Sequence, residues 1–137
     1  MIEARSTNSI LQFKGYEVKK IYFETEESQK GLSYDICPQF MRKIEPIGDN
    51  SYKVTLGCKI ESTKEEPFPF NLEVILDGFF YIEELNRDNE ILLKENSLAI
   101  LFPYLRNIIS TITLNANVSP LILPTMNIVE FFKNDDN

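Results

Sequence analysis

The spacing of apolar residues changes about two-thirds of the way along the chain, and this change narrows the available folds more than any other feature. Residues 52–60 alternate polar and apolar side chains, the apolar ones being Tyr52, Val54, Leu56, Cys58 and Ile60. Residues 68–76 repeat the alternation with Phe68, Phe70, Leu72, Val74 and Leu76. A period of two is typical of a half-buried strand. The polar link at 62–67 therefore predicts a hairpin of two strands.

Further strand signals lie on both sides of this hairpin link. In residues 10–24 the apolar side chains change parity twice, once beside Gly15, which predicts two bulges or bends in the first strand. Residues 34–47 give a weaker pattern whose two prolines indicate an irregular or edge strand. Gly78 interrupts the second strand of the hairpin and predicts either a bulge or a close approach of backbone.

The last third of the chain has helical spacing. Ser97 is the predicted N-cap of a helix from Leu98 to Ala116, and Pro103 is expected to kink this helix or to mark its true start. The helix is apolar on most sides, so it should be buried on most sides. One sheet covers only one side, and the other side is expected to meet another subunit. The residues expected at this oligomer interface are Leu101, Leu105, Ile108, Ile109 and Ile112.

The organisation expected is a single domain over residues 1–137. A short final helix should run through Phe132, capped by Thr125 or Asn127, and Asn115 and Asn117 suit the end of the long helix. The polar segments 1–8 and 133–137 are expected to be loose tails.

Charge and residue content exclude several classes of function. A net charge of −7 with scattered Lys and Arg argues against nucleic acid as a partner. The chain has no His, which removes the commonest general base and zinc ligand, so no catalytic residue, metal or cofactor is predicted. No apolar run approaches the ~20 residues of a membrane span, and the N-terminus lacks the apolar core of a signal peptide. We therefore expect a cytoplasmic protein with reduced thiols and no membrane insertion.

An apolar tripeptide between two prolines is the most unusual segment. Residues 121–123 lie between Pro120 and Pro124, which predicts an extended loop. The tripeptide either fills the core between the helices or forms one wall of an open trough beside the sheet. The second interpretation predicts an adaptable apolar groove for other polypeptides. The expected lining of this groove is Ile36, Phe40, Ile44, Leu121, Ile122, Leu123 and Met126.

The order of these features resembles the SecB family of bacterial protein-export chaperones. The resemblance rests on Leu101-Phe102-Pro103-Tyr104 followed by Arg106, on the Pro-rich apolar loop, and on the ending from Met126-Asn127 to Phe132. It implies an α+β fold in which a four-stranded antiparallel sheet carries two helices on one side. It also implies a homotetramer, a dimer of dimers, that binds unfolded or precursor polypeptides without ATP and delivers them to SecA.

The resemblance also assigns candidate contacts. Glu24 and Glu73 match acidic positions through which the family meets SecA, and they are the SecA-contact candidates. Another matching acidic position is Lys20 here, a reversal of charge, and Ile36 stands at the position of a groove tryptophan. Some SecB-like proteins instead serve toxin–antitoxin systems by holding an aggregation-prone antitoxin.

Three hypotheses for function remain open on the sequence. The first is a holdase that binds preproteins for export through the Sec translocase. The second is a dedicated chaperone of a toxin–antitoxin system, or another protein that binds a single partner. The third is a small-molecule carrier using the same trough. A small ligand would need several polar side chains pointing at it as anchors, and the sequence does not show them.

Overall fold

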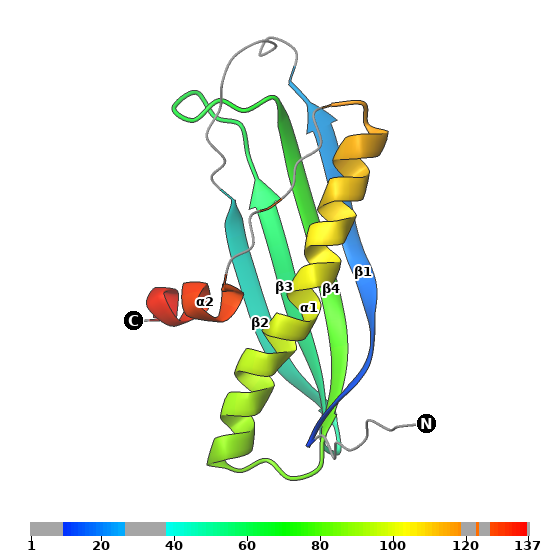
Figure 1. The fold of residues 1–137 in the computed structure, drawn as a ribbon, viewed down its shortest axis with the longest axis vertical. Helices are drawn as coiled ribbons and strands as arrows, with labels where there is room; N and C mark the ends of the chain where they lie inside the picture. Colours follow the sequence, from blue (N-terminus) through cyan, green and yellow to red (C-terminus); the bar gives the residue numbers. More distant parts are fainter. Residues whose placement is uncertain (1–9, 27–37, 119–122, 124–126, 137) are drawn as a thin grey trace.

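A computed structural model describes residues 10–26, 38–118, 123 and 127–136. Four antiparallel strands form one sheet in the order β1-β4-β3-β2. The elements are β1 (Leu11–Thr25), β2 (Gln39–Gly48), β3 (Ser51–Ile60), β4 (Phe70–Ile82), α1 (Arg87–Asn115) and α2 (Ile128–Asp136). Helix α1 crosses one face of the sheet diagonally, and α2 lies beside it on the same side (Figure 1). The implied architecture of four strands with two helices on one side is confirmed.

The predicted hairpin forms the centre of the sheet. β3 and β4 pair from Ser51 to Ile60 without a register shift, so alternate side chains of both strands face the helices. The buried side chains on this inner face include Val54, Leu56, Cys58, Ile60, Leu72, Val74, Leu76 and Phe80. Burying each large apolar side chain contributes about 1.5–3 kcal/mol. The core therefore lies between the central strands and α1.

Gly78 marks a close approach rather than a bulge. The β3–β4 ladder runs through it without a shift. A Cβ placed at residue 78 would lie 2.6 Å from Cδ2 of Leu101 on α1. The glycine therefore lets a leucine of the helix sit directly on the sheet.

Strand β1 contains the two predicted irregularities. Its register against β4 shifts between Phe13 and Tyr16 and again between Val18 and Lys20. Gly15 has a φ of 107°, in the left-handed region that favours glycine. These two bulges keep the apolar side chains of β1 on the inner face despite the changes of parity in the sequence.

The boundaries of α1 correct the sequence analysis. The helix begins at Arg87, because Asn86 caps it by accepting a hydrogen bond from the Asn89 N–H at 3.0 Å. Ser97 is buried inside the helix, where its hydroxyl donates to the Leu93 carbonyl, so its predicted role as N-cap was wrong. Pro103 lies within the helix rather than at its start. The expected end is confirmed, since Asn117 adopts a φ of 61° just beyond the C-cap.

Helix α2 is longer than predicted. Asn127 caps it by accepting a hydrogen bond from the Glu130 N–H at 3.1 Å, as expected. The helix continues to Asp136, so residues 133–136 are not a loose tail. Lys133 Nζ lies 3.5 Å from Glu95 Oε2, which ties the end of α2 to α1.

By length and composition alone, helix α1 could span a membrane, which differs from the expectation that no run of the chain is long and apolar enough. Its apolar side chains belong to the core shared with β3 and β4, and a core helix of a folded domain can have the same length and composition.

Candidate functional site

Aromatic side chains meet where β2, α1 and α2 converge. The ring of Phe40 on β2 lies edge-on to Phe102 of α1, with centroids 6.0 Å apart, and to Phe131 of α2 at 5.3 Å. The guanidinium carbon of Arg42 lies 4.9 Å from the ring centroid of Phe132. Phe40 and Phe131 are only half-buried, whereas Phe102 and Phe132 are buried. This aromatic cluster, made of Phe40, Phe102 and Phe131, is therefore accessible in part to another molecule.

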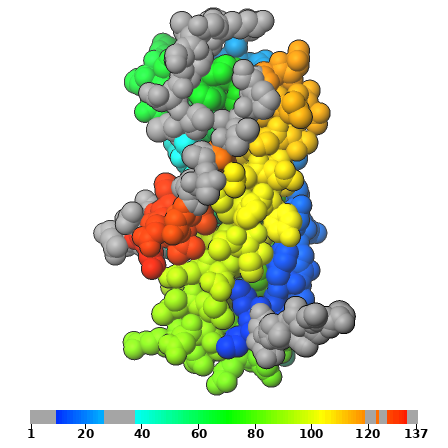
Figure 2. All heavy atoms as spheres, in the orientation of Figure 1, coloured from blue at the N-terminus to red at the C-terminus, as the bar shows by residue number. Residues whose placement is uncertain are grey.

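A hollow of about 330 Å³ lies next to the aromatic cluster, between α1 and α2. The two helices stand against each other in the space-filling view, α2 in red beside the yellow part of α1 (Figure 2). The residues lining the hollow are Ala99, Phe102, Pro103, Arg106, Asn127, Ile128 and Val129. Most of these side chains are apolar, and the only charge among them is the guanidinium of Arg106.

The predicted groove lining is only partly recovered. Leu123 has no exposed surface and belongs to the core, so its prediction as a groove wall was wrong. For this residue the alternative of a core filler is correct. Phe40 and Ile44 are half-buried on the side of β2 that faces the helices, where they pack on the core. Ile36, Leu121, Ile122 and Met126 lie outside the described residues.

The predicted oligomer interface needs a similar correction. Leu101, Leu105 and Ile109 have no exposed surface, because they pack between α1 and the sheet, and they cannot contact another subunit. Ile108 and Ile112 are half-buried and stay candidates. Helical spacing identified the apolar side of α1 but could not tell which residues the sheet itself covers.

Sequence reasoning missed an exposed apolar row on β1. Tyr16, Val18 and Ile21 are 38%, 42% and 54% exposed although they face the same side as the core. The ring of Tyr16 stacks on Tyr104 of α1 at 4.6 Å, and beyond this contact α1 leaves β1 uncovered. The signal was present in the parity changes of β1, but only the path of α1 shows that the row is open.

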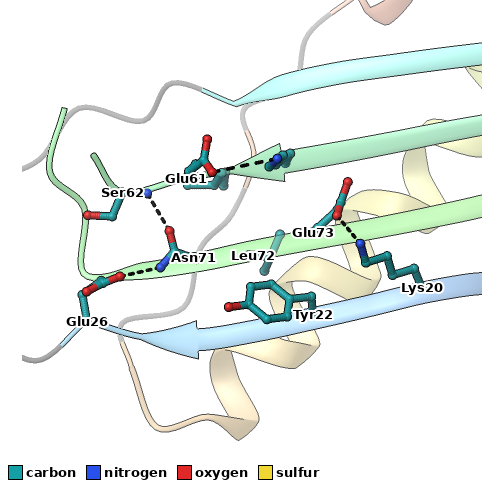
Figure 3. A pocket seen from close by; sticks show the side chains of 10 residues that line it. Lys20, Tyr22, Glu26, Glu61, Ser62, Asn71, Leu72 and Glu73 are labelled. Atoms are coloured by element: carbon teal, nitrogen blue, oxygen red, sulfur yellow. Dashed lines mark hydrogen bonds and ion pairs between the residues drawn. The ribbon is translucent and has the colours of Figure 1, made fainter. Parts of the chain in front are cut away.

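The two SecA-contact candidates lie on the opposite, outer face of the sheet. Glu73 Oε1 accepts a hydrogen bond from Lys20 Nζ at 2.7 Å, beside a shallow pocket (Figure 3). Glu24 accepts a hydrogen bond from the Tyr22 hydroxyl at 3.0 Å, and this bond raises the pKa of Tyr22. The structure therefore places both acids on one face but engages each of them with a neighbour.

The rest of the outer face carries mixed charge. Glu45 lies 3.4 Å from Lys53 and 3.6 Å from Lys43, and the hydrogen bond from Lys53 is the main cause that lowers the pKa of Glu45. Lys59 Nζ lies 3.9 Å from Glu61. Within the described part of the chain, His, Cys, Asp and Glu side chains form no cluster able to hold a metal ion.

A family model described as "Preprotein translocase subunit SecB" matches residues 4–137. The chain belongs to the SecB family. SecB proteins are chaperones rather than enzymes, and a chaperone role follows from this membership. Tetramers and a cytoplasmic location are typical of the family.

Similar proteins agree with this assignment to the SecB family. An uncharacterized protein of Methanocaldococcus jannaschii is 36% identical over 132 residues, covering 90% of this chain and 83% of that protein. The protein-export protein SecB of Bartonella quintana is 29% identical over 122 residues, covering 85% and 77%. Among solved structures, a SecB-like chaperone of Mycobacterium tuberculosis in complex with a ChAD peptide from an antitoxin matches with a TM-score of 0.68 and 15% identity, covering 85% of this chain and 90% of that one. This last likeness shows that the two chains share a fold.

Proposed function

We propose that this SecB-family chain is a cytoplasmic, ATP-independent holdase that binds unfolded polypeptide where β2, α1 and α2 meet. The observation that carries this proposal is the half-open aromatic cluster of Phe40, Phe102 and Phe131 beside an apolar hollow. Aromatic rings offer a large apolar contact area without demanding one partner shape. Such a surface suits the apolar side chains that a non-native chain exposes.

The proposal is tested by direct titration of several unrelated, permanently unfolded proteins into the chain without nucleotide. Binding to all of them supports the holdase, and binding to none contradicts it. Phe131→Ala should weaken binding by about fivefold to tenfold, the cost of roughly one aromatic contact. Tyr22→Ala is the control, because Tyr22 is an exposed aromatic residue on the outer face, away from the aromatic cluster, and its loss should leave binding unchanged.

This site could serve many different clients or a single one. A general export chaperone would take many preproteins and pass them to SecA, whereas a dedicated chaperone would take one partner such as an antitoxin. The contact between Lys20 and Glu73 favours the dedicated role, because it neutralises an acid that the family resemblance assigns to SecA. Capture from a mixture of defined unfolded proteins separates the two: uniform capture supports export, and strong preference for one antitoxin supports the dedicated role.

A homo-oligomer is the second part of the proposal. β1 is an edge strand of 15 residues, and its row of Tyr16, Val18 and Ile21 is open. Edge strands with exposed apolar side chains tend to pair with another chain, and a second copy offers the same edge. A dimer of dimers would need a further surface, for which the half-buried Ile108 and Ile112 on α1 are candidates.

The assembly is tested by light scattering coupled to size-exclusion chromatography. The parent chain should elute as a tetramer, and Ile21→Lys should shift it toward monomers because the open apolar row of β1 would then carry a charge. Ile91→Lys is the control, since Ile91 is a similarly exposed isoleucine near the start of α1. A parent chain that is monomeric at micromolar concentration would contradict the proposed assembly.

A further inference from the structure

One end of the molecule displays aliphatic side chains that the core does not use. Leu85, in the link between β4 and α1, is 46% exposed, and Ile91, in the second turn of α1, is 51% exposed. Neither side chain belongs to the core or packs against it. Two further exposed isoleucines lie at the same end of the sheet, Ile10 next to the start of β1 and Ile47 next to the turn between β2 and β3. Exposed aliphatic side chains gathered in one place are typical of an interaction surface.

Leu85 and Ile91 share a second hollow, of about 520 Å³, at the start of α1. The first turns of α1, in lime green, lie below α2 in the space-filling view (Figure 2). Ile91 precedes Phe102 of the aromatic cluster by about 16 Å along the helix axis. The second hollow is therefore separate from the aromatic cluster. Its remaining lining consists of Asn86, Arg87, Glu90 and Lys94.

Hydrogen bonds fix the link that presents Leu85. The side-chain amide of Asn89 donates to the Glu84 carbonyl at 2.6 Å, and the Asn89 N–H donates to the Asn86 side chain at 3.0 Å. Leu85 lies between these two bonded points, so the link holds it in a defined position. A leucine just before an N-cap often packs on an apolar residue at the fourth helical position, but that residue is Glu90 here. The start of α1 thus gives Leu85 no apolar partner of this kind.

The surface around the second hollow is acidic. Glu90 lies 3.7 Å from Lys94, so these two charges neutralise each other, and Arg87 is left as the cation of the lining. The helix dipole accounts for acidic residues in the first turn of α1, but it does not require those that precede the helix or lie in the β2–β3 turn. In the described part of the chain, the carboxylates of this end that form no ion pair are Asp49, Glu83, Glu84 and Asp88.

We propose that this end of the molecule docks an amphipathic helix of a partner protein, one whose apolar stripe is bordered by Lys and Arg side chains. The apolar stripe fills the second hollow against Leu85 and Ile91, and the partner's cations meet the surrounding carboxylates. This surface is additional to the proposed holdase site. It also lies outside the β1 row and the part of α1 proposed for assembly, so a tetramer leaves it available.

A helix suits this surface better than other occupants. The second hollow is lined by a helix and its cap rather than by a strand edge, so an extended segment would find no row of free main-chain groups there. A helix already bonds its own main chain and needs only side-chain contact. The surrounding carboxylates would repel an acidic helix or an anionic membrane.

The test uses a stapled helical peptide of leucine and lysine with a single apolar stripe, titrated into the chain and followed by fluorescence anisotropy. Leu85→Ser and Ile91→Ser should each weaken binding about tenfold, because each removes one aliphatic contact. Their melting temperatures should change little, since both side chains are exposed. Leu114→Ser is the matched control, at an exposed leucine in the last turn of the same helix, and should bind like the parent. Equal binding by the parent and Ile91→Ser would overturn the proposed docking.

Charge is tested with a second helix that carries Glu in place of Lys. It should bind the parent at least several-fold more weakly. The double variant Glu83→Lys/Glu84→Lys should weaken the lysine helix several-fold in low salt, with the effect fading as salt screens it. Glu65→Lys/Glu66→Lys makes the same change of charge in the exposed link between β3 and β4 and should have little effect. Equal binding of the two helices, or equal losses in the two double variants, would contradict recognition of a basic helix.

Phe131→Ala separates this surface from the holdase site. It should leave binding of the lysine helix unchanged. If Phe131→Ala weakens the helix and Ile91→Ser does not, the peptide is held as a client, and the proposed docking fails while the holdase proposal stands. If the chain binds no unfolded protein but still binds the helix through Leu85 and Ile91, the holdase proposal fails and the docking surface stands.

Discussion

Lys20 Nζ lies 2.7 Å from Glu73 Oε1 across the pair of strands β1 and β4, so an ammonium group covers a carboxylate on the outer face of the sheet. Lys20 is about half exposed, at 52%, and an exposed pair of this kind contributes about 0–1 kcal/mol to stability. The ion pair therefore matters more for recognition than for folding. It neutralises negative charge on the surface that the family resemblance assigns to SecA.

This relationship predicts how charge on the outer face controls the binding of SecA. Lys20→Glu should free Glu73, add negative charge, and strengthen SecA binding several-fold in low salt, with the gain fading as salt screens it. Lys64→Glu is the control, because it makes the same change of charge in the exposed link between β3 and β4. Titration of SecA at two salt concentrations is the measurement. Equal effects of both variants would show that only net charge matters, and no binding by any form would remove SecA as a partner.

A second prediction concerns the contact between Gly78 and α1. Gly78→Ala would place a methyl group 2.6 Å from Leu101, inside the core, and should lower the free energy of unfolding by about 1–3 kcal/mol. Gly57→Ala is the matched control, because its nearest neighbour is the flexible Met41 side chain at 3.0 Å and the loss should be smaller. Urea denaturation of both variants measures the difference. A Gly78→Ala protein as stable as the parent would contradict the close packing of α1 on the sheet.

A third prediction follows from the burial of Leu123. Leu123→Ala should destabilise the chain by about 2–5 kcal/mol, as expected for a fully buried leucine. Leu123→Asp should prevent stable folding, because it would bury a carboxylate without a partner. Circular dichroism with urea denaturation is the measurement. A Leu123→Asp protein that stays folded and loses only client binding would instead restore Leu123 to an open groove.

A fourth prediction uses the thiol of Cys58. Burial raises its pKa from 9.0 to about 12 in the folded chain. In a Cys37→Ser background, a thiol reagent at pH 8 should therefore label Cys58 only when the chain unfolds. The unfolded thiol ionises near 9 and the folded thiol near 12, so the free energy of unfolding should fall as pH rises through this interval. Rapid labelling of the folded chain would contradict the packing of β3.

The arrangement of the strands was largely predictable from the sequence, because a period of two reports directly which side of a strand is buried. The same logic located the two bulges of β1 through changes of parity. Capping preference, in contrast, misplaced the start of α1. Ser97 is a good capping residue, but it lies inside a helix that Asn86 already caps. Local capping preference could not reveal this, since the extra turns of α1 are mostly polar and are held against the core by Leu93 and Leu92.

The candidate site was less predictable than the fold. The pattern around Leu123 contains no information on whether a leucine between prolines faces the core or solvent, and the structure places it in the core. The hollow depends on α2 returning to the side of α1, which brings Ile128 beside Arg106. No spacing within either segment indicates that contact.

The central claim, that this chain holds unfolded polypeptide, is tested most directly by light scattering of a chemically unfolded protein diluted into buffer without nucleotide. With the chain present at a near-stoichiometric ratio, aggregation should be strongly delayed for several unrelated clients, and Phe131→Ala should delay it less than the parent does. If the parent leaves the aggregation of every client unchanged, the holdase account is contradicted.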